Sequence, residues 1–189
     1  MPWKNGLGTT TEIAVDPPSA GLDGFSWRIS VAELTASGPF SSFPGVDRII
    51  VQTDGDPMEL LHDGHGHRRL ARLTPVRFDG EWSTHGELAT PARDFNVMTR
   101  RERVRAGVSV YELAAGSAVR SVAVGATQIV HALRGTLAVA GDEAITLGEG
   151  DTLVVTAGAG LEIAAASGGA VGLVVDLVEI AARAPSLRG

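Results

Sequence analysis

The chain has 189 residues, 44% hydrophobic and 20% charged, a composition typical of a folded protein with a sizeable core rather than of a disordered segment. Its formal net charge of −6 argues against a nucleic-acid partner, which would require clustered positive charge. It contains no cysteine, which excludes disulfides and thiolate metal sites, and no apolar run long enough for a membrane-spanning helix. We therefore expect a cytoplasmic protein with no nucleic-acid or membrane partner.

Glycines and prolines divide the chain into short segments rich in valine, isoleucine, leucine and threonine, and such segments predict β-strands. Only the end of the chain, at residues 175–184, favours a short helix. Many short strands separated by turns indicate an all-β sandwich or barrel. In chain order, the candidate strands are residues 25–34, 47–53, 58–62, 84–90, 93–100, 107–114, 127–135, 136–141, 143–156, 161–167 and 170–180.

Strand alternation constrains which polar residues can meet. In the segment WRISVAEL, Arg28 and Glu33 fall on opposite faces, so they cannot line one pocket without a bulge. The guanidinium of Arg28 suits a carboxylate ligand, and it suits an ion pair with an acidic neighbour equally well. In RDFNVMTR, Asp94 and Asn96 share one face. Burying them is costly unless they bind each other, a backbone loop or a ligand.

The segment LLHDGHGHRR gathers three histidines, His62, His65 and His67, around an Asp-Gly step. A metal site is conceivable, because His65 and His67 would share one face of a strand. The intervening glycines favour a different structure, since Asp-Gly between apolar strands is typical of a hairpin turn. We interpret this segment as a solvated hairpin.

The second half carries a cue to the fold. Gly125, five further residues and His131 resemble the start of the cupin metal motif, followed by a turn at Arg134–Gly135 between two strands. Leu133 occupies the place of the second histidine, and the later ligands have no counterpart. Because such metals need about three converging protein ligands, we predict no metal cofactor and interpret His131 as a packed or surface strand residue.

Three segments in order, PWKNGLGTTTEIA (2–14), WRISVAELTASGPFSSFPGVDR (27–48) and RDFNVMTRR (93–101), closely resemble the motifs of the HutD/Ves family. The resemblance implies a bicupin of two fused RmlC-type jelly-roll β-barrels, with residues 1–105 as the half that carries the motifs and residues 106–189 as the second. It also implies a regulatory or ligand-sensing role linked to histidine utilisation, without an established catalytic activity. The implied ligand is a small anionic intermediate of histidine breakdown, such as urocanate or formylglutamate.

Carried over position by position, the motifs imply a ligand site in the first half. Lys4 is the single lysine beside 15 arginines, and a compact ammonium group next to a glycine-rich loop suits an anion in a narrow site. Leu7 departs from the family, which usually has a glycine there, and this change would stiffen the loop. The candidate ligand-binding residues are Trp3, Lys4, Asn5, Gly6, Thr10, Arg28, Glu33, Arg48, Asp94 and Asn96.

Three classes of function stay open. The first is a metal-free sensor that binds a small carboxylate without chemistry of its own. The second is a metal-independent isomerase or hydrolase with Glu33 or Asp94 as the acid or base, which the lack of a metal-ligand set and of a nucleophilic triad disfavours. The third is a structural partner protein whose plain second half forms a homodimer through an edge strand or a sheet face.

Overall fold

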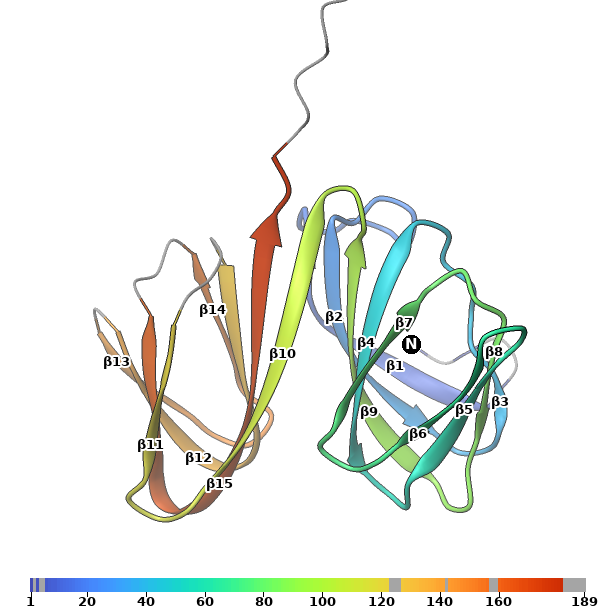
Figure 1. Ribbon diagram of the computed structural model, residues 1–189. Helices are drawn as coiled ribbons and strands as arrows, with labels where there is room; N and C mark the ends of the chain where they lie inside the picture. The colour runs from blue at the N-terminus through green and yellow to red at the C-terminus, as the bar shows by residue number, and fades with distance from the viewer. Residues whose placement is uncertain (2, 4–5, 123–126, 142, 157–159, 182–189) are drawn as a thin grey trace, which may run out of the picture.

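The computed structural model describes residues 1, 3, 6–122, 127–141, 143–156 and 160–181. These residues form β-strands joined by turns, without a helix, which confirms the predicted all-β class. Figure 1 shows two β units side by side. Within the described ranges, no helix is long and apolar enough to cross a membrane.

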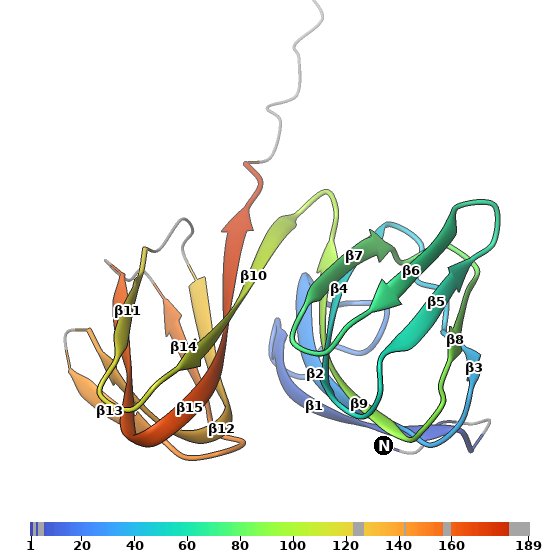
Figure 2. The same ribbon diagram turned by 60° about the horizontal axis from the view of Figure 1, so that its bottom comes forward.

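The first unit is built from two antiparallel sheets that face each other (Figures 1 and 2). One sheet has five strands in the order β1-β2-β9-β4-β7, and the other has four in the order β3-β8-β5-β6. Between them lies an apolar core that includes Ile50, Leu60 and Phe78. The strands are β1 (Gly8–Asp16), β2 (Trp27–Leu34), β3 (Gly38–Pro39), β4 (Val46–Asp54), β5 (Met58–His62), β6 (Gly66–Leu70), β7 (Pro75–Asp79), β8 (Thr84–Glu87) and β9 (Ala92–Arg100).

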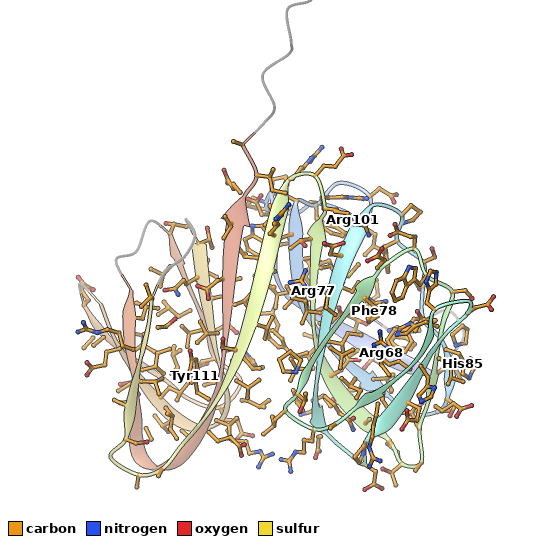
Figure 3. All side chains as sticks on the ribbon, in the orientation of Figure 1. Arg68, Arg77, Phe78, His85, Arg101 and Tyr111 are labelled. Atoms are coloured by element: carbon orange, nitrogen blue, oxygen red, sulfur yellow. The ribbon has the colours of Figure 1, made fainter. Side chains whose placement is uncertain are left out.

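The second unit is a curled sheet with its own core, which includes Val130, Leu137 and Ile163. Its strands run in the order β10-β15-β12-β13, while β11 pairs with β15 and β14 pairs with β12. The single tyrosine, Tyr111, lies in this unit (Figure 3). The strands are β10 (Val104–Leu113), β11 (Ala118–Ser121), β12 (Thr127–Ala140), β13 (Ala144–Leu147), β14 (Thr152–Thr156) and β15 (Leu161–Glu179).

Two local predictions for the second half are wrong. The expected turn at Arg134–Gly135 is a bulged bend inside one strand, β12, which pairs with β15 on both sides of it. Gly135 has a φ of 67°, and a Cβ there would lie 2.6 Å from the oxygen of Gly169, so only glycine fits this bend. At the end of the chain, β15 runs to Glu179, which confirms the candidate strand at 170–180 over the alternative helix at 175–184. Residues 182–184 lie outside the described ranges.

The helix prediction failed because β15 is buried between the two units, where alternating Val175 and Leu177 point toward the first unit. Phe95 on β9 belongs to the same apolar cluster, and its ring centroid lies 5.1 Å from that of His131 on β12. Arg77 on β7 faces β10 (Figure 3) and donates a hydrogen bond to the carbonyl of Ala106. One apolar cluster therefore joins the two units. The boundary between residues 105 and 106 stays a prediction.

Candidate functional site

A pocket of about 580 Å³ opens into the first unit. Its floor is the inner face of the five-stranded sheet, and one wall is the segment between β2 and β4, including Pro39, Phe40 and Phe43. Trp3 forms part of a second wall, and Met1 and Leu22 also line the pocket. These two are among the exposed large apolar residues, at 71% and 43% exposure, so apolar side chains reach solvent at the pocket.

Strand register brings the polar floor together. Arg28 on β2 and Arg48 on β4 both lie opposite Met98 on β9, so two guanidinium groups flank one strand. One step along the same face, Asn96 lies between Ser30 and Ile50. The next row places Asp94 between Ala32 and Gln52. Adjacent antiparallel strands present such rows on one face, so residues distant in the chain meet in one pocket.

Arg28 has a counter-ion inside the protein. Its Nε donates a hydrogen bond of 2.7 Å to Oε2 of Glu12 on β1, and its Nη1 lies 3.4 Å from Oγ of Ser30. The guanidinium is buried, whereas Glu12 is partly exposed. Its charge is therefore already compensated, and the sequence-based alternative of an ion pair with an acidic neighbour holds in this structure.

Arg48 has no such partner among the described residues. Its side chain is buried, its Nε has no hydrogen-bond acceptor, and its Cζ lies 5.1 Å from the ring centroid of Phe40, 5.8 Å from Phe43 and 5.2 Å from Phe78. Burial lowers the pKa of Arg48 to about 10, an effect that Asp94 opposes and Arg28 reinforces. Arg48 therefore stays charged at neutral pH, held by aromatic faces rather than by an ion pair.

Asp94 and Asn96 are also unsatisfied. Both are buried, and the Oδ1 atom of each has no hydrogen-bond partner. Burial raises the pKa of Asp94 to about 7, although the nearby charge of Arg48 opposes the change. The sequence left open a hydrogen bond between Asp94 and Asn96 or a bond from them to a backbone loop. The Oδ1 atoms of both residues make neither bond to a described residue. Buried unsatisfied polar groups are rare and costly, so the floor has the features of a ligand site.

Trp3 is fixed by its own loop. Its backbone N–H donates to the carbonyl of Gly8 at 2.9 Å, and its Nε1 donates to Oγ1 of Thr10 at 2.7 Å. A Cβ on Gly8 would lie 2.4 Å from the oxygen of Glu33 and 3.2 Å from the indole. Glycine at position 8 therefore lets the indole lie close against β1 and form the pocket wall.

We expect Gly8→Ala to destabilise the protein by about 1–3 kcal/mol, because the added methyl group must displace either the indole or the β2 backbone. Thermal unfolding followed by tryptophan fluorescence measures this change. Gly21→Ala is the matched control, since a Cβ there meets nothing within 4 Å, and it should stay within about 0.5 kcal/mol of the wild type. Equal melting temperatures for the two variants would contradict the close packing of Trp3.

The structure brings together six of the ten predicted residues: Trp3, Thr10, Arg28, Arg48, Asp94 and Asn96 all line the pocket. Glu33 lies on the opposite face of β2, where its Oε1 accepts a 2.7 Å bond from Arg93, as strand parity requires. Gly6 is exposed outside the pocket lining with a φ of 73°. Lys4 and Asn5 lie outside the described residues.

The prediction missed nine lining residues, which are Met1, Leu22, Ser30, Ala32, Pro39, Phe40, Ser41, Phe43 and Met98. Ser30 and Met98 continue the same strand faces as Arg28 and Asn96, so alternation alone places them on the floor. Phe40 and Phe43 belong to the second family motif, but their contact with Arg48 depends on how a loop folds back over the sheet.

The histidine segment forms the hairpin predicted from its glycines, because β5 and β6 pair around Gly64, whose φ is 71°. His65 stacks on Trp82 with ring centroids 4.1 Å apart, while His62 is buried and bonds Oγ1 of Thr84. Burial lowers the pKa of His62, so its imidazole is mainly neutral near pH 7. Within the described part of the chain, no group of three or more His, Asp or Glu residues could hold a metal ion.

His131 is a packed strand residue, as predicted. Its Nδ1 lies 2.8 Å from Oγ1 of Thr152, and its ring contacts Phe95 between the two units. Burial lowers the pKa of His131 to about 4, despite an opposing effect of Asp151. A neutral imidazole with one hydrogen bond stabilises the interface and does not reach the pocket in the first unit.

Two packed β units with a small pocket inside the first define a bicupin-type, two-barrel fold. Solved structures of low sequence identity share this architecture, such as YhaK from Escherichia coli, with a TM-score of 0.66 and 14% identity over 90% of this chain and 93% of that one. A Cupin 2 conserved barrel domain protein from Leptotrichia buccalis has a TM-score of 0.58 and 11% identity over 89% of this chain and 88% of that one. These likenesses show the cupin-like fold alone.

The HutD family model matches residues 1–173, and the chain belongs to this family. An uncharacterised 21.2 kDa protein from the hutC 3′ region of Pseudomonas putida is 44% identical over 113 residues, 59% of each chain. Protein Ves of Cronobacter sakazakii is 44% identical over 111 residues, 57% of this chain and 59% of the relative. The matched part thus spans less than two thirds of these relatives.

Two solved structures of about one third sequence identity match almost the whole chain. A conserved protein of unknown function from Pseudomonas aeruginosa PAO1 has a TM-score of 0.84 and 33% identity, covering 94% of this chain and 93% of that one. HutD from Pseudomonas fluorescens SBW25 (formate condition) has a TM-score of 0.78 and 34% identity, covering 95% of this chain and 93% of that one. The HutD/Ves resemblance seen in the motifs is therefore confirmed.

Proposed function

We propose that this HutD family member binds a small carboxylate metabolite of the urocanate or formylglutamate type, without a metal, and acts as a regulatory or metabolite-sensing factor in histidine utilisation. Membership of the HutD family and the relative from the hutC 3′ region support the metabolic context. The pocket of about 580 Å³ is large enough for ligands of this size.

The observation that carries this proposal is the guanidinium of Arg48, which has no ion pair among the described residues. It is buried in the pocket with a free Nε donor and has no ion pair within the described part of the chain. A buried guanidinium without an ion pair is costly, and an incoming carboxylate would reduce that cost while forming a charge-assisted hydrogen bond. Arg28 adds a second positive group whose own partner is Glu12.

The rest of the lining supports a compact ligand that carries an N–H donor as well as a carboxylate. Asn96 presents a buried carbonyl oxygen without a partner, and such an oxygen accepts a hydrogen bond from an amide or an imidazole. Trp3 and Phe40 offer apolar surfaces for a flat or short ligand body. Urocanate combines an imidazole with a carboxylate, and formylglutamate combines an amide with two.

A thermal-shift titration with urocanate and with N-formylglutamate tests this proposal. We expect a saturable rise in melting temperature for at least one compound, and a rise in Kd of at least about tenfold in Arg48→Gln, which removes the charged hydrogen bond. Arg48→Gln should still fold, because it removes a buried unpaired charge.

Arg93→Gln is the matched control. Arg93 lies on β9 of the same sheet, but its side chain is exposed and pairs with Glu33 on the outer face. It should bind as the wild type does. If neither compound raises the melting temperature, carboxylate binding at Arg48 is contradicted. Equal affinities in Arg48→Gln and Arg93→Gln would contradict it as well.

A second candidate function is a metal-independent isomerase or hydrolase with Asp94 as the acid or base. The observation in its favour is the pKa of Asp94, which burial raises to about 7, the range in which general acid–base catalysis at neutral pH is most effective. Glu33, the other residue considered from the sequence, lies on the outer face of the sheet. Proton NMR of each compound incubated with the protein distinguishes conversion from binding alone.

A further inference from the structure

The side chain of Asp94 lies on the floor of the pocket with no hydrogen bond to any described residue. Its neighbours across the sheet do not provide one, because Ala32 has no polar group and Gln52 is engaged elsewhere. The Nε2 atom of Gln52 donates to the carbonyls of Asp54 and Asp56, at 3.2 and 2.5 Å, and its Oε1 accepts from the backbone of Met58. Asp94 is thus a carboxylate that the fold buries without a side-chain hydrogen bond among the described residues, although the charge of Arg48 favours its ionised form.

The charged groups around Asp94 come from each neighbouring strand. Arg48 on β4 acts on it directly through its charge, and Arg28 on β2 is compensated by Glu12 on β1. The segment between β2 and β4 carries no charged residue from 35 to 45. At the pocket entrance, the amino group of Met1 donates to the carbonyl of Thr10.

The opposite sheet adds one buried titratable side chain among its described strands, His62 on β5. Its imidazole is held by Thr84 and packs against Phe78, which also contacts Arg48. Phe78 therefore lies between His62 and the polar floor. Among the described residues that line this pocket, Asp94 is the one carboxylate and none is an imidazole, so Asp94 is the acidic group whose protonation can respond to a ligand there.

On the basis of the proposed function, we propose that the pocket takes up one proton with each carboxylate ligand and that Asp94 receives it. An ionised Asp94 and a ligand carboxylate in one small buried site repel each other, so one must be protonated. The proton comes from solvent and binds an oxygen of Asp94, converting an acceptor into an O–H donor. That donor can then form a hydrogen bond to the ligand carboxylate, while Arg48 provides the positive charge that balances this carboxylate.

The pH range follows from the burial of Asp94. In the free pocket its pKa is about 7, and a bound anion raises that pKa further. Below pH 6, Asp94 is already protonated, so binding takes up almost no proton. Above pH 7, Asp94 in the free pocket is mostly ionised, and binding requires a proton from solvent. Affinity should therefore be constant at acidic pH and fall by up to tenfold per pH unit above 7.

Isothermal titration of the full chain with N-formylglutamate tests this coupling, because the carboxyl groups of this probe titrate well below pH 6. At pH 8, titrations in two buffers with different ionisation enthalpies give the number of protons taken up per ligand. We expect a value close to one for the wild type and close to zero for Asp94→Asn. The Kd of Asp94→Asn should also be independent of pH between 6 and 8.

Asp54→Asn is the matched control, because Asp54 ends β4 of the same sheet with an exposed side chain outside the pocket. It should keep the pH profile and proton uptake of the wild type. Wild-type binding with a flat pH profile and no proton uptake would overturn this inference and leave the proposed function standing. Failure of N-formylglutamate to bind at both pH 6 and pH 8 would instead contradict a ligand of the formylglutamate type, and with it the proton uptake inferred for that ligand.

Discussion

Asp94→Asn is expected to make the protein more stable than the wild type at pH 8, by roughly 2–4 kcal/mol, and to raise its melting temperature by roughly 5–10 °C. The gain comes from removing a buried charge that has no hydrogen bond to a described residue and that Arg48 compensates only in part. Most substitutions of a buried residue destabilise a protein, so this sign is a specific consequence of the unsatisfied carboxylate.

The size and pH range follow from proton linkage. Burial raises the pKa of Asp94 in the folded protein to about 7, against an ordinary value of 3.8. The unfolded chain thus releases its proton first, and wild-type stability falls as the pH rises from about 4 to about 7. That difference in pKa corresponds to about 4 kcal/mol at pH 8, and the buried, unpartnered amide of the variant offsets part of the gain.

Chemical denaturation of both proteins between pH 4.5 and pH 8 measures this effect. The difference in free energy of unfolding should be small at the acidic end and reach its full size above pH 7. Asp54→Asn should stay within about 0.5 kcal/mol of the wild type throughout, since it removes an exposed carboxylate. A difference that is independent of pH, or an Asp94→Asn variant less stable than the wild type at pH 8, would contradict the unpartnered state of Asp94.

The fold was predictable because its signals are local. Alternation in residues 27–34 and 93–100 separates the inward residues Arg28 and Asp94 from the outward residues Ile29 and Phe95, and the structure confirms this. The bend at Gly135 was not predictable in the same way. A glycine with positive φ suits both a hairpin turn and a bulge in a long strand, and only the pairing partner, β15, distinguishes the two.

The candidate site was predictable as a set of residues but not as an electrostatic arrangement. The motifs supplied both arginines and Asp94, whereas their different states depend on contacts between distant segments. Glu12 compensates Arg28, and phenylalanines from a loop and from β7 surround Arg48. Sequence spacing shows which faces these residues share, but not which charge stays unpaired, since that depends on which counter-ions are within reach.

Phe95→Ala is expected to cost about 3–5 kcal/mol and to lower the melting temperature by roughly 10–15 °C. Phe95 is fully buried on the outward face of β9, and it contacts the ring of His131 across the boundary between the two units. The apolar cluster around it combines Ile49 and Val97 of the first unit with Ile129, Leu173 and Val175 of the second. A cavity at this position therefore weakens the packing of both units at once.

Because the cluster belongs to both units, the loss should shift one cooperative transition. All three tryptophans, Trp3, Trp27 and Trp82, lie in the first unit, so fluorescence follows that unit while far-ultraviolet circular dichroism follows the whole chain. The two melting curves should coincide in the wild type and move together in Phe95→Ala. Val154→Ala, at a 42% exposed position on β14, should shift neither curve by more than about 2 °C. Separate fluorescence and dichroism transitions in the wild type would mean that the units unfold independently and that the shared cluster does not couple them.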